Sequence, residues 1–297
     1  MPVALLLGIL LHSWCVALKD VVPFIIFTIL LLTFCAVDIR QLRLSWLDVW
    51  LMTFQVTVGC GGYVVLRLCG VDEVISQAVL IGVLCPVASA VAVVSCILGA
   101  NRQTVTTYTI IDNLMVALVA PFMFTAIGVH PELSFFHSLW IIMCKIAPTL
   151  ALPFVIAWLL QRWWPKGNEA LARHRGKAFY FWALALFFTL GQTIHYIVEH
   201  GEGVWREVAW MAFASLTACV VQFGVGRKIG RQYGDVVAGG QLLGQKNSAM
   251  GIWMANTFLI PLSSVFLACY SIYQNLFNSW QLWRHDRRTS QNSQNRK

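Results

Sequence analysis

Three ionisable residues lie deep inside otherwise apolar stretches of the sequence: Asp112, Lys145 and Lys246. Each is about 9 to 13 residues from the nearer end of its stretch, or roughly 14 to 20 Å along a helix. A charge at that depth in a bilayer costs on the order of 3 kcal/mol unless it faces protein or water. These residues therefore predict a site that handles ions or a charged ligand. A structural ion pair between Asp112 and one lysine is the alternative, and it leaves one lysine over for an anion.

The rest of the composition predicts an all-α integral membrane protein. Apolar residues make up 58% of the 297 residues and charged residues only 11%, which excludes an ordinary water-soluble domain. Most of the apolar stretches are long enough for a helix to cross about 30 Å of hydrocarbon. There are ten of them, at 2–18, 21–38, 46–69, 74–98, 103–128, 135–160, 178–198, 206–226, 233–257 and 259–283.

The distribution of basic residues predicts the orientation of these helices, because Lys and Arg gather in cytoplasmic loops. With the N-terminus inside, alternate loops and the C-terminal tail hold sixteen of the 21 basic residues: Arg40, Arg43, Arg102, Arg162, Lys166, Arg173, Arg175, Lys177, Arg227, Lys228, Arg231, Arg284, Arg287, Arg288, Arg296 and Lys297. Both termini are then cytoplasmic, in the plasma membrane or, in a bacterium, the inner membrane. The charge needs no nucleic-acid partner, and the polar tail 284–297 is expected to be disordered.

Two of the expected helices contain breakers at corresponding positions. The fourth is broken by Cys85-Pro86-Val87-Ala88-Ser89, and the ninth by the glycine-rich run 239–248. Pro removes a backbone donor and Gly loosens a helix, so the freed backbone groups need other partners. Such a pair predicts a five plus five inverted repeat, 1–128 and 129–283, whose broken helices cross near the bilayer midplane. A Pro kink in a packed helix is the simpler alternative.

Two stretches carry a resemblance to a known family. Cys85-Pro86 is followed by Thr104-Val105-Thr106-Thr107-Tyr108-Thr109 and Ala120-Pro121, and Gly244-Gln245-Lys246-Asn247-Ser248-Ala249 is followed by Pro261-Leu262 and Tyr273-Gln274-Asn275-Leu276. They resemble the two broken-helix motifs and the last helix of the bile acid sodium symporter family of ten-helix transporters. The resemblance runs from about the second helix to residue 283, and it places Gln55 near a sodium-binding Gln of that family.

The chain departs from that family at positions that bind sodium there. An Asn of helix four becomes Ala, at Ala90 or Ala92, a Glu of helix nine becomes Leu242, and a Gln becomes Lys246. Ordinary two-sodium coupling is therefore in doubt. The ammonium of Lys246 could take the place of a site-organising sodium ion, bonded to Ser89 with Asp112 as counter-charge, or it could release a proton and couple transport to protons.

From these considerations we predict a substrate- or ion-binding set of nine residues: Lys246, Asn247, Gln245, Ser248, Ser89, Asp112, Thr106, Thr109 and Gln55. No catalytic residue, metal site or cofactor is predicted, apart from the sodium ion whose binding is in doubt. For Thr106 and Thr109, a hydrogen bond from the hydroxyl to a backbone carbonyl of the same helix is the alternative. His195, beside Gln192, fits either a pore lining or a satisfied histidine at a helix contact.

Three functional hypotheses follow. The first is a secondary carrier of a small organic anion that works by alternating access between a mobile bundle holding the broken helices and a smaller panel. The second is a proton-coupled exchanger or a channel-like protein that uses Lys246 and Asp112. The third, a membrane enzyme or sensor, lacks any phosphate-binding, hydrolase or metalloprotease motif. The lipid bilayer and an anionic solute are the expected partners, with monomer or homodimer left open.

Overall fold

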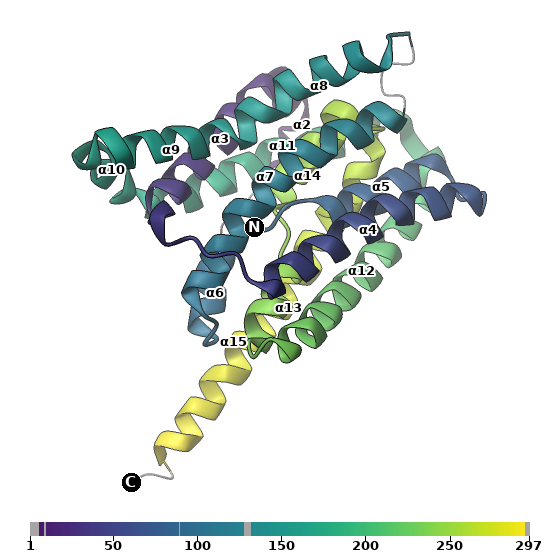
Figure 1. Ribbon diagram of the computed structural model, residues 1–297. Helices are drawn as coiled ribbons and strands as arrows, with labels where there is room; N and C mark the ends of the chain where they lie inside the picture. Colours follow the sequence, from purple (N-terminus) through teal and green to yellow (C-terminus); the bar gives the residue numbers. More distant parts are fainter. Residues whose placement is uncertain (1–5, 9, 89, 128–131, 295–297) are drawn as a thin grey trace.

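The computed structural model describes residues 6–8, 10–88, 90–127 and 132–294 (Figure 1). This part of the chain is helical and contains no β-strand, as the all-α prediction requires. Its α-helices are α2 (His12–Ala17), α3 (Val22–Cys35), α4 (Trp46–Leu68), α5 (Glu73–Leu84), α6 (Val91–Ile97), α7 (Arg102–Ile127), α8 (Phe135–Leu150), α9 (Leu152–Trp163), α10 (Pro165–Ala172), α11 (Ala178–His200), α12 (Trp205–Gln232), α13 (Val236–Gly244), α14 (Ser248–Phe258) and α15 (Ser264–Gln294). Short 3-10 helices lie at Lys19–Val21, Ile39–Gln41, Arg175–Lys177, Gly201–Val204 and Pro261–Ser263.

Several of these helices have the length and composition of membrane spans. Within the described chain four spans qualify: α4, α7, α12 and the segment Arg175–Glu199, which includes all of α11 except its last residue. The pair α8 and α9, bent by 43°, makes a fifth if it is one span. The protein therefore has the helices of a multi-pass membrane protein. The predicted ten spans are not reached by this criterion, because α3 has only 14 residues and the breaks leave pieces of 12 (α5), 9 (α13) and 11 (α14) residues. The count of ten, like the inverted repeat, stays a prediction.

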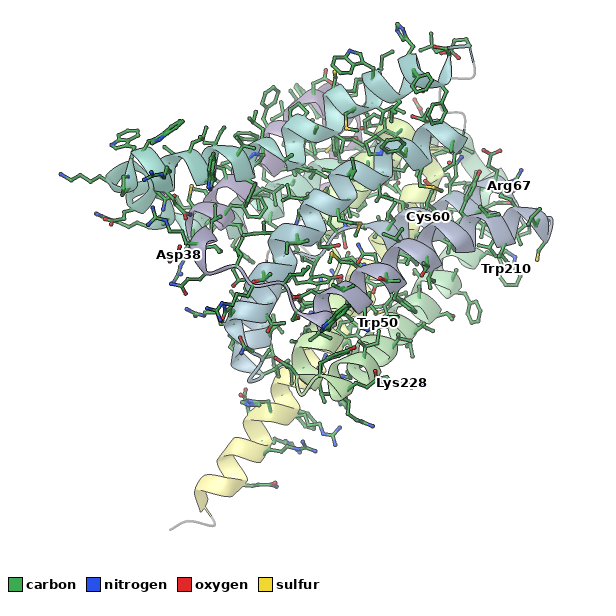
Figure 2. All side chains as sticks on the ribbon, in the orientation of Figure 1. Asp38, Trp50, Cys60, Arg67, Trp210 and Lys228 are labelled. Carbon is green, nitrogen blue, oxygen red and sulfur yellow. The ribbon has the colours of Figure 1, made fainter. Side chains whose placement is uncertain are left out.

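Large apolar side chains cover the outside of the molecule. Figure 2 shows Trp50 on α4 and Trp210 on α12, which are 52% and 57% exposed, and Leu68 and Phe136 reach 82% and 80%. So much exposed apolar surface would be costly in water, whereas a lipid environment accommodates it. The surface thus agrees with the composition in favouring a membrane setting.

The helices pack in two groups. One contains α2, α3, α9 and α11, and the other contains α4, α5, α12, α13 and α15 (Figure 1). Each group takes helices from both sides of residue 128. The predicted halves 1–128 and 129–283 are therefore interleaved in space, whether or not they are repeats of one another.

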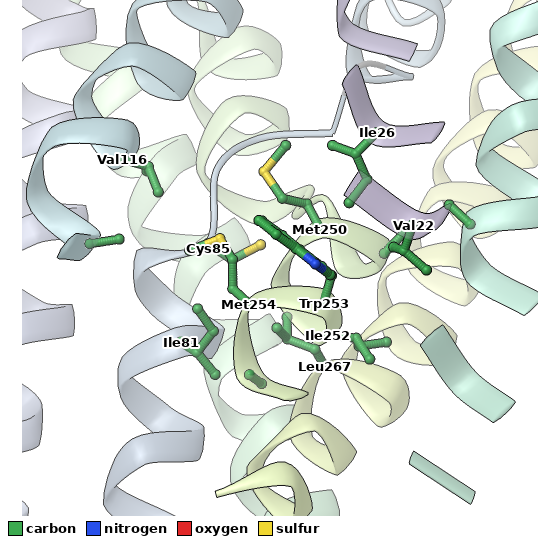
Figure 3. Close-up of a cluster of buried hydrophobic side chains, with 14 of the residues drawn as sticks. Val22, Ile26, Ile81, Cys85, Val116, Met250, Ile252, Trp253, Met254 and Leu267 are labelled. Atoms are coloured by element: carbon green, nitrogen blue, oxygen red, sulfur yellow. The ribbon is translucent and has the colours of Figure 1, made fainter. Parts of the chain in front are cut away.

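The interior between the groups is formed around α14. Its side chains Met250, Ile252, Trp253 and Met254 lie in a buried cluster with side chains of four other helices (Figure 3). The contributing residues labelled in the figure are Val22 and Ile26 of α3, Ile81 of α5 with Cys85 just after it, Val116 of α7 and Leu267 of α15. Burying each large apolar side chain stabilises the fold by about 1.5 to 3 kcal/mol in water, and by packing contacts in lipid. This packing fixes the start of α14, and hence the second break.

The C-terminal tail differs from the prediction. We expected disorder over 284–297, but α15 continues as a helix to Gln294 and projects from the body of the molecule. Its first part is anchored in the core, so the polar residues extend an existing helix instead of nucleating one. Cation–π contacts one turn apart support it, with Arg284 over Trp280 at 5.5 Å and Arg287 over Trp283 at 4.1 Å. Residues 295–297 lie outside the described chain.

Candidate functional site

The two predicted interruptions are present, and they pair with each other. The chain leaves the helix after α5 at residues 85–88, and between α13 and α14 at 245–247. Val87 and Lys246 form an isolated antiparallel β-bridge. The Ala88 amide donates to the Gln245 carbonyl at 3.1 Å, and the Asn247 amide donates to the Pro86 carbonyl at 2.8 Å. Backbone groups that each break frees are thus satisfied by the other break.

Lys246 occupies the centre of this crossing and is fully buried. Its ammonium Nζ donates a hydrogen bond of 3.0 Å to Oε1 of Gln55 on α4. We predicted a contact to Ser89 with Asp112 as counter-charge. Ser89 lies outside the described residues, and in the described chain no ion pair of 4 Å or less joins Lys246 to Asp112. The ammonium instead reaches Gln55 of the neighbouring helix; Gln55 was in the predicted binding set, but its contact with Lys246 was not predicted.

Asp112 of α7 accepts hydrogen bonds both from the first break and from Gln55. One carboxylate oxygen accepts from the Val87 amide at 2.6 Å, and the other accepts from Nε2 of Gln55 at 2.9 Å. Asp112 and Gln55 are both fully buried. The carboxylate therefore satisfies an amide that the break freed, and Gln55 connects it to the cation. Lys246, Gln55 and Asp112, which we call the crossing network, form one buried chain of hydrogen bonds.

Gln55 uses its whole side chain in this network. Its Nε2 also donates to the carbonyls of Leu84 and Cys85 at 3.1 and 3.4 Å, which are the last groups of α5 before the break. Its Oε1 also accepts from the hydroxyl of Tyr108 at 3.2 Å. The amide thus binds a cation, a carboxylate and free helix-end carbonyls at once.

Gln274 of α15 supports the second break in a comparable way. It accepts from the Lys246 amide at 2.8 Å and donates to the Lys246 carbonyl at 3.1 Å, and Ser248 Oγ accepts from it at 3.4 Å. Neither Gln274 nor Tyr108 was among the predicted residues, although both fall in the stretches that carry the family resemblance. The available signal was the same as for Gln55, a lone polar side chain in an apolar helix.

The remaining predicted residues lie around the crossing with more local roles. Asn247 caps α14, because its side chain accepts from the Met250 amide at 3.3 Å. Gln245 donates to Gln241 one turn back. Thr109 bonds back to the Val105 carbonyl at 2.7 Å, which is the structural alternative considered for it, and half-buried Thr106 has no hydrogen bond within the described network.

His195 belongs to a different contact, between α11 and α2. Its Nδ1 lies 2.9 Å from Nδ1 of His12, and its Nε2 lies 3.1 Å from a carboxylate oxygen of Glu199. Within the described chain no group of three metal-binding side chains has the geometry of a metal site. This histidine pair therefore serves as a contact between two helices of the first packing group.

A cleft runs along α4, the helix that carries Gln55. It has a volume of about 530 Å³ and is lined by the start of α4, Thr104 of α7 and Tyr233. A separate shallow hollow of about 360 Å³ lies further along α4, between Val49 and Thr57, and meets Met115 of α7.

Comparison with known proteins adds no family to this description. No protein-family model matches the chain, and no curated protein matches it.

Proposed function

We propose that this protein is a secondary transporter of a small organic anion that works by alternating access. The observation that supports this most directly is the pair of broken helices α5–α6 and α13–α14, joined by backbone hydrogen bonds around a buried cation. Broken helices whose free ends meet are a feature of transporter binding sites, because they present backbone groups and charge inside the protein. A purely structural helix contact needs none of these costly features.

The two packing groups supply the moving parts of this proposal. The second group holds α5 and α13, which lead into the two breaks, and α4, which carries Gln55; the first group holds α2, α3, α9 and α11. Alternating access is rocking of one rigid group against another around a fixed site. We assign the first group to the smaller panel and the second to the mobile bundle.

Lys246 organises the crossing in this proposal. In the bile acid sodium symporter family, which the sequence resembles, sodium ions do so with the help of a carboxylate on helix nine. Here the corresponding position is Leu242, which is fully buried and apolar. Both oxygens of Asp112 already accept hydrogen bonds, and Gln55 Oε1 already receives the ammonium. The donor set therefore does not fit a second cation at this point, and we propose that transport is independent of sodium.

A proton-coupled exchanger or channel-like protein is the second candidate. It is favoured by one observation, that Gln55 links the acid Asp112 to the base Lys246 in a fully buried chain. Loss of the Lys246 proton would leave Asp112 as an uncompensated charge, so proton transfer between the two would keep the site neutral.

Ligand binding and uptake distinguish these proposals. We would screen purified protein for thermal stabilisation by anionic metabolites, once in sodium chloride and once in potassium chloride. A ligand at 100 times its dissociation constant stabilises the folded state by about 2.7 kcal/mol, which is readily measured. We expect equal stabilisation in the two salts. Each ligand found would then be tested for uptake into proteoliposomes under an imposed sodium or proton gradient.

The outcomes separate clearly. Saturable uptake without a sodium gradient supports the carrier, and uptake driven by a pH gradient supports the proton-coupled alternative. Non-saturable flux that follows only the concentration difference indicates a channel. Binding or uptake that requires sodium would contradict the role given to Lys246.

A further inference from the structure

Of the three charged residues found deep inside apolar segments, Lys145 is not part of the crossing network. Asp112 and Lys246 are joined through Gln55, so neither is available to neutralise Lys145. Lys145 lies ten residues into α8 and is exposed, and its side chain makes no hydrogen bond or ion pair with another described residue. A lysine inside an apolar segment is strongly unfavourable if it faces hydrocarbon.

Lys145 lies on a different side of α8 from Phe136 and Trp140, two highly exposed aromatic side chains of this helix. Phe136 and Trp140, 80% and 69% exposed, lie nine and five residues earlier, which is about 2.5 and 1.4 turns, so they point away from Lys145. These two residues mark the lipid-facing side of the helix.

Polar side chains share the side of α8 that carries Lys145. Ser138 lies seven residues earlier and Thr149 four residues later, both within about 40° of Lys145 around the helix. Their exposures are only 3% and 5%, and the buried hydroxyl of Ser138 has no hydrogen-bond partner among the described residues. The Thr149 hydroxyl donates back to the Lys145 carbonyl at 3.0 Å. On this polar face of Ser138, Lys145 and Thr149, the Lys145 ammonium and the Ser138 hydroxyl are thus the groups without a partner among the described residues.

We propose that this polar face of α8 lines the substrate path and that Lys145 binds the anionic group of the substrate. The inference rests on the proposed carrier function and adds a binding residue outside the crossing. A primary ammonium offers three donors at one compact point, which suits a carboxylate or a sulfonate. The free Ser138 hydroxyl, about two turns away, is available to a second polar group of the same ligand. The phosphate of a lipid headgroup is the other anion that could meet Lys145.

The test measures the electrostatic environment beside Lys145 and does not need the substrate. Ile141 lies one turn before Lys145 on the same side of α8 and is partly exposed. We would introduce Ile141→Cys, keep Lys145, and compare its rate of reaction with two water-soluble thiol reagents, the anionic methanethiosulfonate ethylsulfonate and its cationic trimethylammonium analogue. The five native cysteines that are not buried would be replaced by Ser: Cys60, Cys69, Cys96, Cys144 and Cys269.

We expect the anionic reagent to be favoured, and Lys145→Gln to lower the ratio of anionic to cationic rates roughly tenfold, since one charge about 6 Å away in water changes each rate about threefold. Lys145→Arg keeps the charge and should keep the ratio, and Lys145→Met is the second neutral variant if Lys145→Gln does not elute as a folded protein. Trp140→Cys, on the lipid-facing side, should react slowly with both reagents.

Two results would overturn the inference. If neither reagent modifies Ile141→Cys although the protein is folded, the face is dry, and Lys145 meets lipid headgroups or protein instead of a soluble anion. If the cysteine reacts but the ratio is the same with Lys145→Gln, the face is wet but does not select anions. Both results concern α8 alone, so they are distinguishable from a failure of uptake, which would contradict the carrier function itself.

Discussion

Gln55 is the shared hydrogen-bond partner of the two charged residues of the crossing network, Lys246 and Asp112. An amide has an acceptor oxygen and a donor nitrogen, so it satisfies a cation and a carboxylate at the same time. Here the oxygen receives Lys246 Nζ at 3.0 Å and the nitrogen donates to Asp112 at 2.9 Å. The two charges are held apart yet coupled, at a place where each would otherwise be costly.

We therefore predict that Gln55→Leu destabilises the protein strongly. The substitution leaves the ammonium and the carboxylate without their shared partner, and breaking a buried charged pair costs about 3 to 5 kcal/mol. Thermal unfolding of purified protein, followed by tryptophan fluorescence, should show a markedly lower midpoint. Thr57→Val on the exposed side of α4 is the matched control and should stay within about 0.5 kcal/mol of the native protein. Equal midpoints for the two variants would contradict the network.

The second prediction at the residue scale concerns Lys246. Lys246→Gln removes the internal cation and leaves Asp112 uncompensated, so transport should be abolished. Lys228→Gln, an exposed lysine changed in the same way, should transport normally. Adding Leu242→Glu together with Ala90→Asn or Ala92→Asn to Lys246→Gln supplies the missing oxygen donors, and we expect uptake to return in a sodium-dependent form. Normal uptake by Lys246→Gln alone would refute the assigned role.

At the scale of elements, the breaks were predictable from composition, whereas their partners were not. Pro86 indicates an interruption because Pro lacks a donor, and it lies in the first break. The glycine-rich run 239–248 predicted the second break only approximately, because its glycines are helical in α13 and the break follows them at 245–247. That Gln55 and Gln274 satisfy the freed groups depends on how α4 and α15 pack, which no local pattern contains. The helical tail was missed for a related reason, since its polar composition indicates disorder when its anchored first part is ignored.

The close packing of α12 against α13 gives the element-scale prediction. A Cβ added at Gly226 would lie 2.2 Å from the Gly239 carbonyl oxygen, and backbone cannot move aside cheaply. Gly226→Ala should therefore push α13 away, disturb the second break and cost about 1 to 3 kcal/mol. Gly224→Ala on the same helix meets nothing within 4 Å and should be neutral or stabilising, by up to about 1 kcal/mol.

Thermal unfolding of the two variants provides the measurement, and uptake provides the second readout. Gly226→Ala should lose both stability and uptake, while Gly224→Ala keeps both. If the two alanines behave alike, the contact between α12 and α13 does not position the break.

At the scale of the whole molecule, hydrogen bonds tie the basic loops together. The predicted cytoplasmic loops follow α3, α6, α9 and α12, and each is bonded to another. The bonds are Asn168 to the Cys35 carbonyl at 3.0 Å, Gln103 to the Gln41 carbonyl at 2.8 Å, the Asn101 amide to Asp235 at 2.8 Å, and Arg227 to Gln281 of α15. These loops and the basic tail therefore share one end of the molecule.

Sequence and structure thus agree on different aspects of the topology. The charge count predicted which loops belong together, and the hydrogen bonds bring those loops together, two of them without any charged side chain. Length and apolar composition alone recognise fewer than ten spans, because α3 and the broken helices are too short for this criterion. Lys145 illustrates the same limit at one position, since the sequence places it inside an apolar segment but does not give the side of α8 on which it lies.

The clustering of basic loops leads to the last prediction, that this end of the molecule is cytoplasmic, because positive loops are retained inside. We would place single cysteines at Glu169 in the basic loop 162–177 and at Arg206 in the acidic loop 199–207, both exposed, after replacing the native cysteines that are not buried. An impermeant thiol reagent should label Arg206→Cys in intact cells and Glu169→Cys only after permeabilisation. Asp286→Cys on the projecting part of α15 should behave like Glu169→Cys. Labelling of Glu169→Cys in intact cells would reverse the orientation, and different behaviour of Glu169→Cys and Asp286→Cys would show that the basic loops do not share one side.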